Sequence, residues 1–294
     1  MSDNSPSTLG MLWRGALMGL AEVVPGVSGG TMALVTGIYR ILVEGLASFG
    51  AKSLSLLASP KDFYTHHNLA QLLPLAAGMG IGIAIFAQVI GYLIDNFPPV
   101  VWAFFFGVIL ASVVRVGSDA LANGPAGLTI LIAVLGVVLS LGLYLIPQLD
   151  SAPTLWVFFF AGALAICAWI LPAVSGSYLL LVLGLYEPVI DAIRNFDLLL
   201  IMVFGGGCAV GLMLFVRLLQ KLLANHYHQL LSLLTGFMLG SVMNLWPWRV
   251  SSEARFASPE EYLAMTGFDP FLLPVGISLL LGVAFLWLIS SYRV

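Results

Sequence analysis

A short stretch that combines proline, serine and glycine interrupts the first apolar part of the chain. It consists of a turn, Pro25 and Gly26, and of four residues with small or hydroxyl-bearing side chains, Ser28, Gly29, Gly30 and Thr31. Proline ends a preceding helix, glycine allows the chain to reverse, and serine is a preferred N-cap of a new helix. The start of a helix exposes backbone amides and a partial positive charge, which an oxyanion can approach closely where the residues are glycines. The stretch therefore predicts a binding site for an anion, with Ser28 and Thr31 hydroxyls as additional neutral donors.

The same arrangement recurs 147 residues later in the chain. Its turn is Pro172 and Ala173, and its donors are Ser175, Gly176 and Ser177. At this offset the segments Pro25 to Tyr39 and Pro172 to Tyr186 are identical at eight of fifteen positions. We expect the two helix starts to face one another near the middle of the membrane and to share one anion. The alternative is that these residues only allow close helix packing, which is common in membranes.

Two ionisable residues precede the first motif within apolar sequence. Glu22 lies one helical turn before Pro25, and Arg14 lies two turns before Glu22 on the same helix face. An ionisable residue inside a membrane is a functional candidate by default. One hypothesis is that Glu22 is protonated when the anion binds and couples its movement to a proton gradient. The alternative is that Glu22 caps the hairpin or pairs with Arg14.

The composition shows what kind of fold must position these residues. Of 294 residues, 60% are hydrophobic and only 9% are charged, and the mean hydropathy is +1.04. Soluble domains carry about 25% charged residues. The sequence therefore predicts an all-α polytopic membrane protein, in which most apolar stretches have the roughly 20 residues that a membrane-crossing helix needs.

The apolar stretches fall into two halves, residues 1–150 and 151–294. Each half is predicted to contain a re-entrant helical hairpin followed by three transmembrane helices. The first half has the hairpin 10–47 and the spans 70–95, 99–115 and 126–147. The second half has the hairpin 154–193 and the spans 198–222, 230–247 and 271–292. At an offset of 129, glycines and other residues of the first two spans also match between the halves, which indicates an internal duplication.

The distribution of positive charge favours hairpins that turn back within the membrane, because Lys and Arg concentrate on the cytoplasmic side. With re-entrant hairpins, eight of the eleven Lys and Arg residues are cytoplasmic, whereas only four are if each hairpin crosses once. An odd number of crossings per half makes the second half inverted relative to the first. The N- and C-termini are then both cytoplasmic, and Trp248 to Asp269 form an external loop.

Other classes of function find little support in the sequence. The formal net charge of −3 provides no basic patch for nucleic acid. The four histidines lack Cys or carboxylate partners at zinc-ligand spacing, so neither a metal nor a cofactor is expected. Cys167 and Cys208 lie in apolar segments, where a small buried hydrophobic role is typical.

Both motifs, each followed by Gly-x-Tyr at Gly37 and Gly184, resemble those of the polyprenyl-phosphate transporter family. The resemblance extends over nearly the whole chain, including the glycine-rich run 205–211 and the pattern that ends at Trp246 and Pro247. It implies a flippase of the bacterial inner membrane, not an enzyme. The cargo would be undecaprenyl phosphate, the lipid carrier of wall and surface glycans, returned from the outer to the inner leaflet. Fixed donors at mid-depth would lower the cost of taking a phosphate through hydrocarbon.

Two alternatives remain open at this level. An undecaprenyl-pyrophosphate phosphatase would also use inverted re-entrant hairpins. The motif of that family, however, resembles Ser-Arg-Ser at the position where this chain has Ser28-Gly29-Gly30 and Ser175-Gly176-Ser177. Cleavage of a phosphoanhydride needs such a charged clamp. An anion transporter or channel would share the broken helices without needing an opening for a lipid tail.

Overall fold

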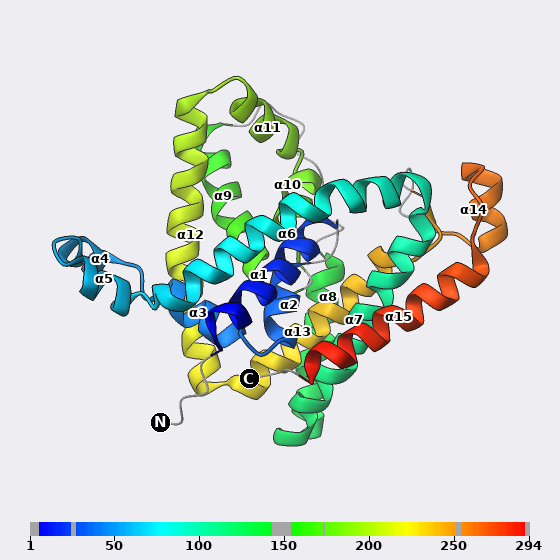
Figure 1. Cartoon of the computed structure of the whole chain (residues 1–294), viewed down its shortest axis with the longest axis horizontal. Coiled ribbons are helices and arrows are strands. Elements are labelled where there is room, and N and C mark those ends of the chain that lie inside the picture. The colour runs from blue at the N-terminus through cyan, green and yellow to red at the C-terminus, as the bar shows by residue number, and fades with distance from the viewer. Residues whose placement is uncertain (1–5, 25–27, 143–153, 173, 251–254, 292–294) are drawn as a thin grey trace.

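The computed structural model describes residues 6–24, 28–142, 154–172, 174–250 and 255–291. Its regular structure is almost entirely helical (Figure 1). The helices of the first half are α1 (Thr8–Val23), α2 (Gly29–Val35), α3 (Tyr39–Ala47), α4 (Ala51–Leu56), α5 (Pro60–His66), α6 (Leu69–Asn96), α7 (Pro98–Asn123) and α8 (Ala126–Gly142). Those of the second half are α9 (Leu155–Ile170), α10 (Gly176–Val182), α11 (Tyr186–Arg194), α12 (Leu198–Asn225), α13 (Tyr227–Ser241), the 3₁₀ turn η2 (Val242–Leu245), α14 (Pro259–Thr266) and α15 (Leu272–Ser290). Between η2 and α14, β1 (Arg249–Val250) pairs antiparallel with β2 (Arg255–Phe256).

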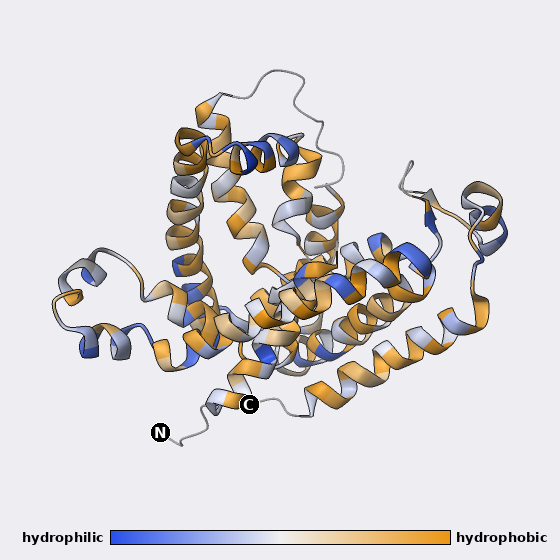
Figure 2. Ribbon diagram, turned by 45° about the horizontal axis from the view of Figure 1, so that its top comes forward, coloured by the Kyte–Doolittle hydropathy of each residue, from blue (hydrophilic) through white to orange (hydrophobic). Residues whose placement is uncertain are grey.

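The predicted class, an all-α polytopic membrane protein, is confirmed. Within the described residues, α6, α7, α12 and α15 are each long and apolar enough to cross a membrane. The shorter apolar helices α8 and α9 have 17 and 16 described residues. Hydrophobic residues cover most of the length of the long helices (Figure 2). Many of them are exposed, as on α6 and α12, which is the surface that lipid chains would cover.

Several helix ends differ from the boundaries expected from hydropathy. The expected span 99–115 is part of α7, which continues to Asn123, so Arg115 lies within the helix and not at its end. The helix ends where Gly124 and Pro125 follow. Hydropathy marks the part of a helix that contacts hydrocarbon, whereas caps and prolines fix where the helix itself ends. For the same reason the expected span 230–247 is α13 from Tyr227, followed by a 3₁₀ turn before Trp246.

The second limb of each predicted hairpin is two helices and not one. The limb 26–47 breaks between α2 and α3, whose axes differ by 117°. Gly37 at the break has φ of 81°, a left-handed conformation that favours glycine. The Ile38 amide donates to the Ala33 carbonyl (2.9 Å) and the Gly37 amide to the Leu34 carbonyl (3.2 Å), the two bonds of a Schellman C-cap.

The second half repeats this break between α10 and α11. Gly184 has φ of 71°. The Leu185 amide donates to the Leu180 carbonyl (2.8 Å) and the Gly184 amide to the Leu181 carbonyl (3.0 Å). The same local sequence thus produces the same cap 147 residues apart.

Helix packing also repeats between the halves. Gly78 on α6 lies so close to α1 that an added Cβ would meet the Leu12 carbonyl, and Gly207 on α12 lies in the same way against Phe159 of α9. Gly78 and Gly207 correspond at the offset of 129, and Leu12 and Phe159 at 147. Glycine at these positions is therefore required by the approach of two backbones.

The last helix of each predicted half packs against the other half. α15 lies along α7, where Gly107 abuts the Leu279 carbonyl, and α8 lies along α13, where Gly236 abuts the Ala133 carbonyl. These exchanged contacts join the two halves, and the division at residue 150 is a division of the sequence and not of the packing.

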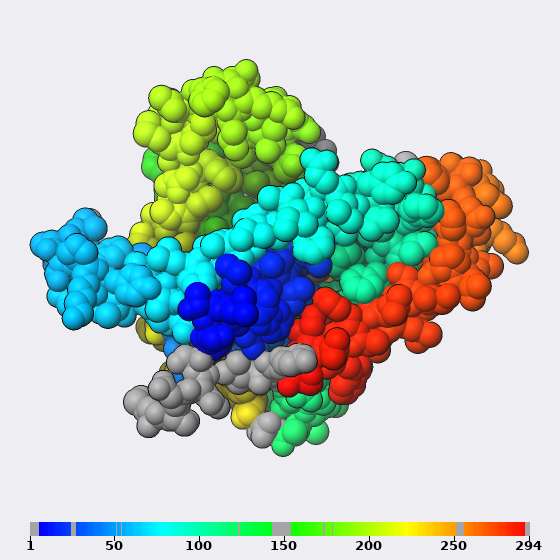
Figure 3. Space-filling view, in the orientation of Figure 1, coloured from blue at the N-terminus to red at the C-terminus, as the bar shows by residue number. Residues whose placement is uncertain are grey.

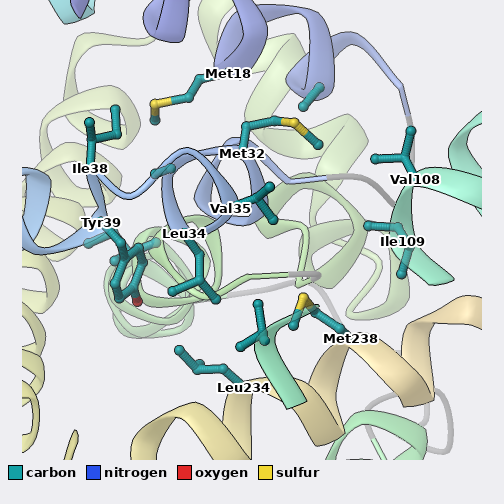
Figure 4. Close-up of a cluster of buried hydrophobic side chains, with 14 of the residues drawn as sticks. Met18, Met32, Leu34, Val35, Ile38, Tyr39, Val108, Ile109, Leu234 and Met238 are labelled. Carbon is teal, nitrogen blue, oxygen red and sulfur yellow. The ribbon is translucent and has the colours of Figure 1, made fainter. Parts of the chain in front are cut away.

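Helix α2 is at the centre of the main hydrophobic cluster, and all seven of its residues are buried. Figure 4 shows its side chains among those of α1, α7 and α13. The labelled residues of the cluster are Met18, Met32, Leu34, Val35, Ile38, Tyr39, Val108, Ile109, Leu234 and Met238. The segment that carries the first motif is thus fixed by packing on several sides.

Candidate functional site

Helix α1 ends at Val23, and Glu22 in its last turn faces the start of α2. The Glu22 Oε1 atom accepts a hydrogen bond from the Gly29 amide at 2.7 Å. The first amides of a helix lack partners within the helix, and a carboxylate there is favoured by the helix dipole. In this structure Glu22 therefore occupies the position that the sequence assigns to a bound anion.

Ser28 is the N-cap of α2 and is buried. Its Oγ accepts from the Gly30 amide at 3.1 Å, and its carbonyl accepts from the Thr31 amide at 2.9 Å. Together with the bond from Gly29 to Glu22, each of the three amides predicted to bind an anion has an acceptor within the protein. Thr31 is also buried.

The Ser28 hydroxyl connects the first motif to the second. It donates to the Leu171 carbonyl at 3.2 Å, with the Trp169 carbonyl also within reach at 3.4 Å. These carbonyls belong to the end of α9, where the last groups of a helix have no partner in the helix. Because a serine hydroxyl has a single proton, this contact uses the donor that Ser28 would offer a ligand.

Close backbone approach explains one glycine of the first motif. A Cβ added at Gly30 would meet the Ile170 carbonyl oxygen and the carbonyl carbon of Leu171. Residues 30 and 170 are far apart in sequence, yet their backbones touch. The contact brings the start of α2 against the end of α9, immediately before Pro172.

The second motif is more open than the first. Ser175 is half-buried, Gly176 is buried and Ser177 is exposed. The Ser175 and Ser177 hydroxyls lie 2.9 Å apart and hydrogen-bond to each other. Pro172 is buried, whereas the predicted turn residues Pro25, Gly26 and Ala173 lie outside the described residues.

Arg14 is buried in α1, and its guanidinium is directed toward the beginning of that helix. Nη1 donates to the Gly10 carbonyl at 2.9 Å, and the guanidinium carbon lies 4.5 Å from the centre of the Trp13 ring. Glu22 is two helical turns further along the chain, about 12 Å along the axis.

Trp169 is a site residue that the motif alone did not reveal. Its side chain hydrogen-bonds to Glu22. At the offset of 147, Trp169 is the counterpart of Glu22 in the other half. The repeat in the sequence pairs these two positions, and that pairing is the signal that identifies Trp169.

Comparisons with known proteins agree on one family. The family described as undecaprenyl phosphate translocase-like matches residues 18–262. A polyprenyl-phosphate transporter of Vibrio cholerae is 36% identical over 275 residues, which cover 92% of this chain and 89% of the relative. A polyprenyl-phosphate transporter of Staphylococcus aureus is 26% identical over 250 residues, which cover 80% of this chain and 84% of the relative.

No solved structure matches the chain at a significant level. The family match spans most of the sequence and both motifs. The alignment with the Vibrio cholerae transporter covers nearly the full length of this chain. This chain is therefore a member of the undecaprenyl phosphate translocase-like family.

Proposed function

We propose that the protein carries a polyprenyl phosphate, undecaprenyl phosphate in bacteria, between the two leaflets of the cytoplasmic membrane. The observation that carries this proposal is the meeting of the two motifs, in which Ser28 of the first donates to the Leu171 carbonyl beside the second. Broken helices that meet inside a membrane protein are a recurrent way to build a transport site. The names of the two relatives support a polyprenyl phosphate as the cargo.

The phosphate binds between the motifs, at Ser28, Gly29, Gly30 and Thr31 on one side and at Ser175, Gly176 and Ser177 on the other. In the described conformation the first set is engaged by Glu22 and by the end of α9, while Ser177 is exposed. The second motif is accordingly where the phosphate first arrives. Release of the Ser28 hydroxyl and the Gly29 amide then lets the first motif join it.

Movement between leaflets uses two inverted halves that rock against each other around the site. The matching C-caps at Gly37 and Gly184 support the duplication, as do the equivalent contacts of Gly78 and Gly207. The distribution of Lys and Arg supports re-entrant hairpins with both termini in the cytoplasm. Recycling of the carrier then runs from the outer to the inner leaflet.

Glu22 couples this movement to the proton gradient. A carboxylate at the start of α2 repels an arriving phosphate, and protonation removes that charge. The bond from the Gly29 amide to Glu22 supports the role, because the phosphate and the carboxylate compete for the same donor. Arg14 holds the hairpin in place from the other end of α1.

A phosphatase and an ion channel are the other functions to be tested. Neither motif contains Arg, Lys or His, and the nearby Arg14 is directed toward Gly10. Release of inorganic phosphate by the purified protein would favour the enzyme, and ion currents without lipid would favour the channel.

The decisive experiment reconstitutes the protein into liposomes that carry labelled undecaprenyl phosphate in one leaflet. We expect the wild type to exchange the lipid between leaflets, and Ser28→Ala and Ser175→Ala to slow the exchange. If all three proteins exchange the lipid equally fast, the assignment of the site is wrong. If the wild type does not exchange it at all, the proposed function is wrong.

A further inference from the structure

A cavity of about 570 Å³ lies between α1, α6, α7 and α15. Its wall is formed by the end of α6, the start of α7, the start of α15 and a single residue of α1, Leu20. In Figure 3 this region lies between the surfaces of α6 (cyan) and α15 (red). Its volume is within the range of about 300–1,000 Å³ that is typical of sites for small molecules.

The lining of the cavity is apolar except for one hydroxyl. Five phenylalanines contribute to it, among them Phe86, Phe97 and Phe271. The one polar side chain is that of Ser278, whose Oγ donates to the Val100 carbonyl at 2.8 Å. A polar or charged ligand would find no free donor in this side chain, whereas a hydrocarbon loses nothing by entering. The chemistry of the wall therefore selects an apolar occupant.

The cavity lies beside the helix that leads into the first motif, and Leu20 and Glu22 belong to the same turn of α1 but to opposite faces of it. Leu20 precedes Glu22 by two residues, about 3 Å along the helix axis, and Glu22 contacts the Gly29 amide. Two of the helices that form its wall, α7 and α15, also pack against α2. A lipid whose phosphate is held at the motifs can therefore place the adjoining part of its tail in this cavity.

A much smaller pocket lies between the α8 region and the start of α13. Its volume is about 50 Å³, and its lining includes Pro125, Leu128 and Ile132 of the α8 region. These three residues correspond to Phe271, Pro274 and Ser278, which line the large cavity, at the offset of 146 that pairs Gly136 with Gly282. The small pocket also contains His228, Gln229 and Ser232, so its wall is more polar. No described residue of α12, the counterpart of α6, lines the small pocket, so the two pockets correspond in part of their walls only.

We propose that the large cavity binds the isoprene units next to the phosphate while the site faces the outer leaflet. The inference rests on the proposed function and on the proposed orientation, in which the end of α6 and the starts of α7 and α15 lie on the outer side. The described conformation is then the one that accepts the lipid from outside. In the opposite conformation this cavity closes.

The test uses a polyprenyl phosphate that carries a photoreactive diazirine on the isoprene unit nearest the phosphate. The probe is added to proteoliposomes of the full chain, activated by light, and its sites of attachment are mapped by mass spectrometry of peptides. We expect adducts on peptides of α6, α7 and α15 that excess unlabelled polyprenyl phosphate removes and excess phospholipid does not. Equal competition by phospholipid would mean that the cavity accepts any lipid chain, and would overturn the proposal.

Two matched variants fill equivalent positions with the same side chain. Val89 lines the cavity and is 48% exposed, and Leu218, its counterpart at the offset of 129, is 50% exposed. Because a single methylene in an apolar pocket alters binding by about tenfold or more, we expect Val89→Trp to reduce labelling of α6, α7 and α15 by at least about tenfold. Leu218→Trp should leave that labelling unchanged. Equal labelling of both variants would overturn the proposal, provided that their thermal unfolding matches the wild type.

Leaflet exchange measured in the same proteoliposomes separates this inference from the proposed function. If the wild type exchanges the lipid but the probe attaches to other helices, the cavity assignment fails and the transport function stands. If exchange is absent and the probe attaches to α6, α7 and α15 no more than to the other helices, both fail.

Discussion

Replacing Gly30 by alanine tests the contact on which the site depends. An added Cβ would meet the backbone of Ile170 and Leu171, which cannot move aside as a flexible side chain would. Overpacking of this kind costs about 1–3 kcal/mol, and the higher helix propensity of alanine returns at most about 1 kcal/mol. We expect Gly30→Ala to lower the free energy of unfolding by about 1–2 kcal/mol.

Gly80→Ala is the matched control, since a Cβ at Gly80 of α6 would have no neighbour within 4 Å. Alanine there should stabilise the helix by about 0.5–1 kcal/mol. The two variants should therefore differ by roughly 2 kcal/mol, which corresponds to a difference of about 3 °C in Tm in a chain of this size.

The assay is thermal unfolding of both variants in the same detergent, followed by leaflet exchange of labelled polyprenyl phosphate in liposomes. Gly30→Ala should unfold at the lower temperature and exchange the lipid more slowly, while Gly80→Ala should exchange it as the wild type does. Equal Tm and equal exchange for the two variants would show that the first motif does not touch the end of α9, and would refute the account of the site.

Three further predictions address coupling, pH and backbone conformation. Glu22→Gln keeps an acceptor for the Gly29 amide but cannot release a proton, so lipid binding should persist while exchange no longer responds to a pH gradient; an unchanged response in liposomes with and without a gradient would exclude the coupling role. Burial lowers the pKa of His67, between α5 and α6, below its ordinary value of about 6.5, so the folded segment resists a proton that the unfolded chain accepts. The contribution of His67 to stability should be complete above about pH 6.5 and be lost as the pH falls through the lowered pKa. Hydrogen exchange of residues 48–68 should therefore become faster at low pH in the wild type, and this pH dependence should be absent in His67→Gln. Gly184→Ala should lower the free energy of unfolding by about 1–2 kcal/mol, because Gly184 has a left-handed φ of 71°. Gly205→Ala, where an added Cβ has open space, should not lower it. Equal thermal unfolding of the two variants would contradict the C-cap at Gly184.

Much of the fold could be predicted from local sequence. A stretch of about 20 apolar residues must be a helix in a membrane, because only a helix satisfies its own backbone groups there. The long helices α6, α12 and α15 accordingly lie close to the predicted spans 70–95, 198–222 and 271–292. The break at Gly37 was also present in the sequence as a glycine repeated at Gly184, but hydropathy averages over a window and does not register a single left-handed residue.

The sequence by itself determined that the chain is a helical membrane protein with two related Pro-Ser-Gly motifs. It predicted an anion site at both motifs, with Ser28 and Ser175 among its donors, and Glu22 as a candidate for coupling. Only the tertiary structure decided what these residues contact. Glu22 accepts a hydrogen bond from the Gly29 amide, Ser28 donates to the end of α9, and an apolar cavity lies between α1, α6, α7 and α15. The physical reason is that helix formation depends on neighbours a few residues away within one helix. Glu22 and Gly29 belong to two different helices, Ser28 and Leu171 lie 143 positions apart, and the cavity depends on how four helices fill space.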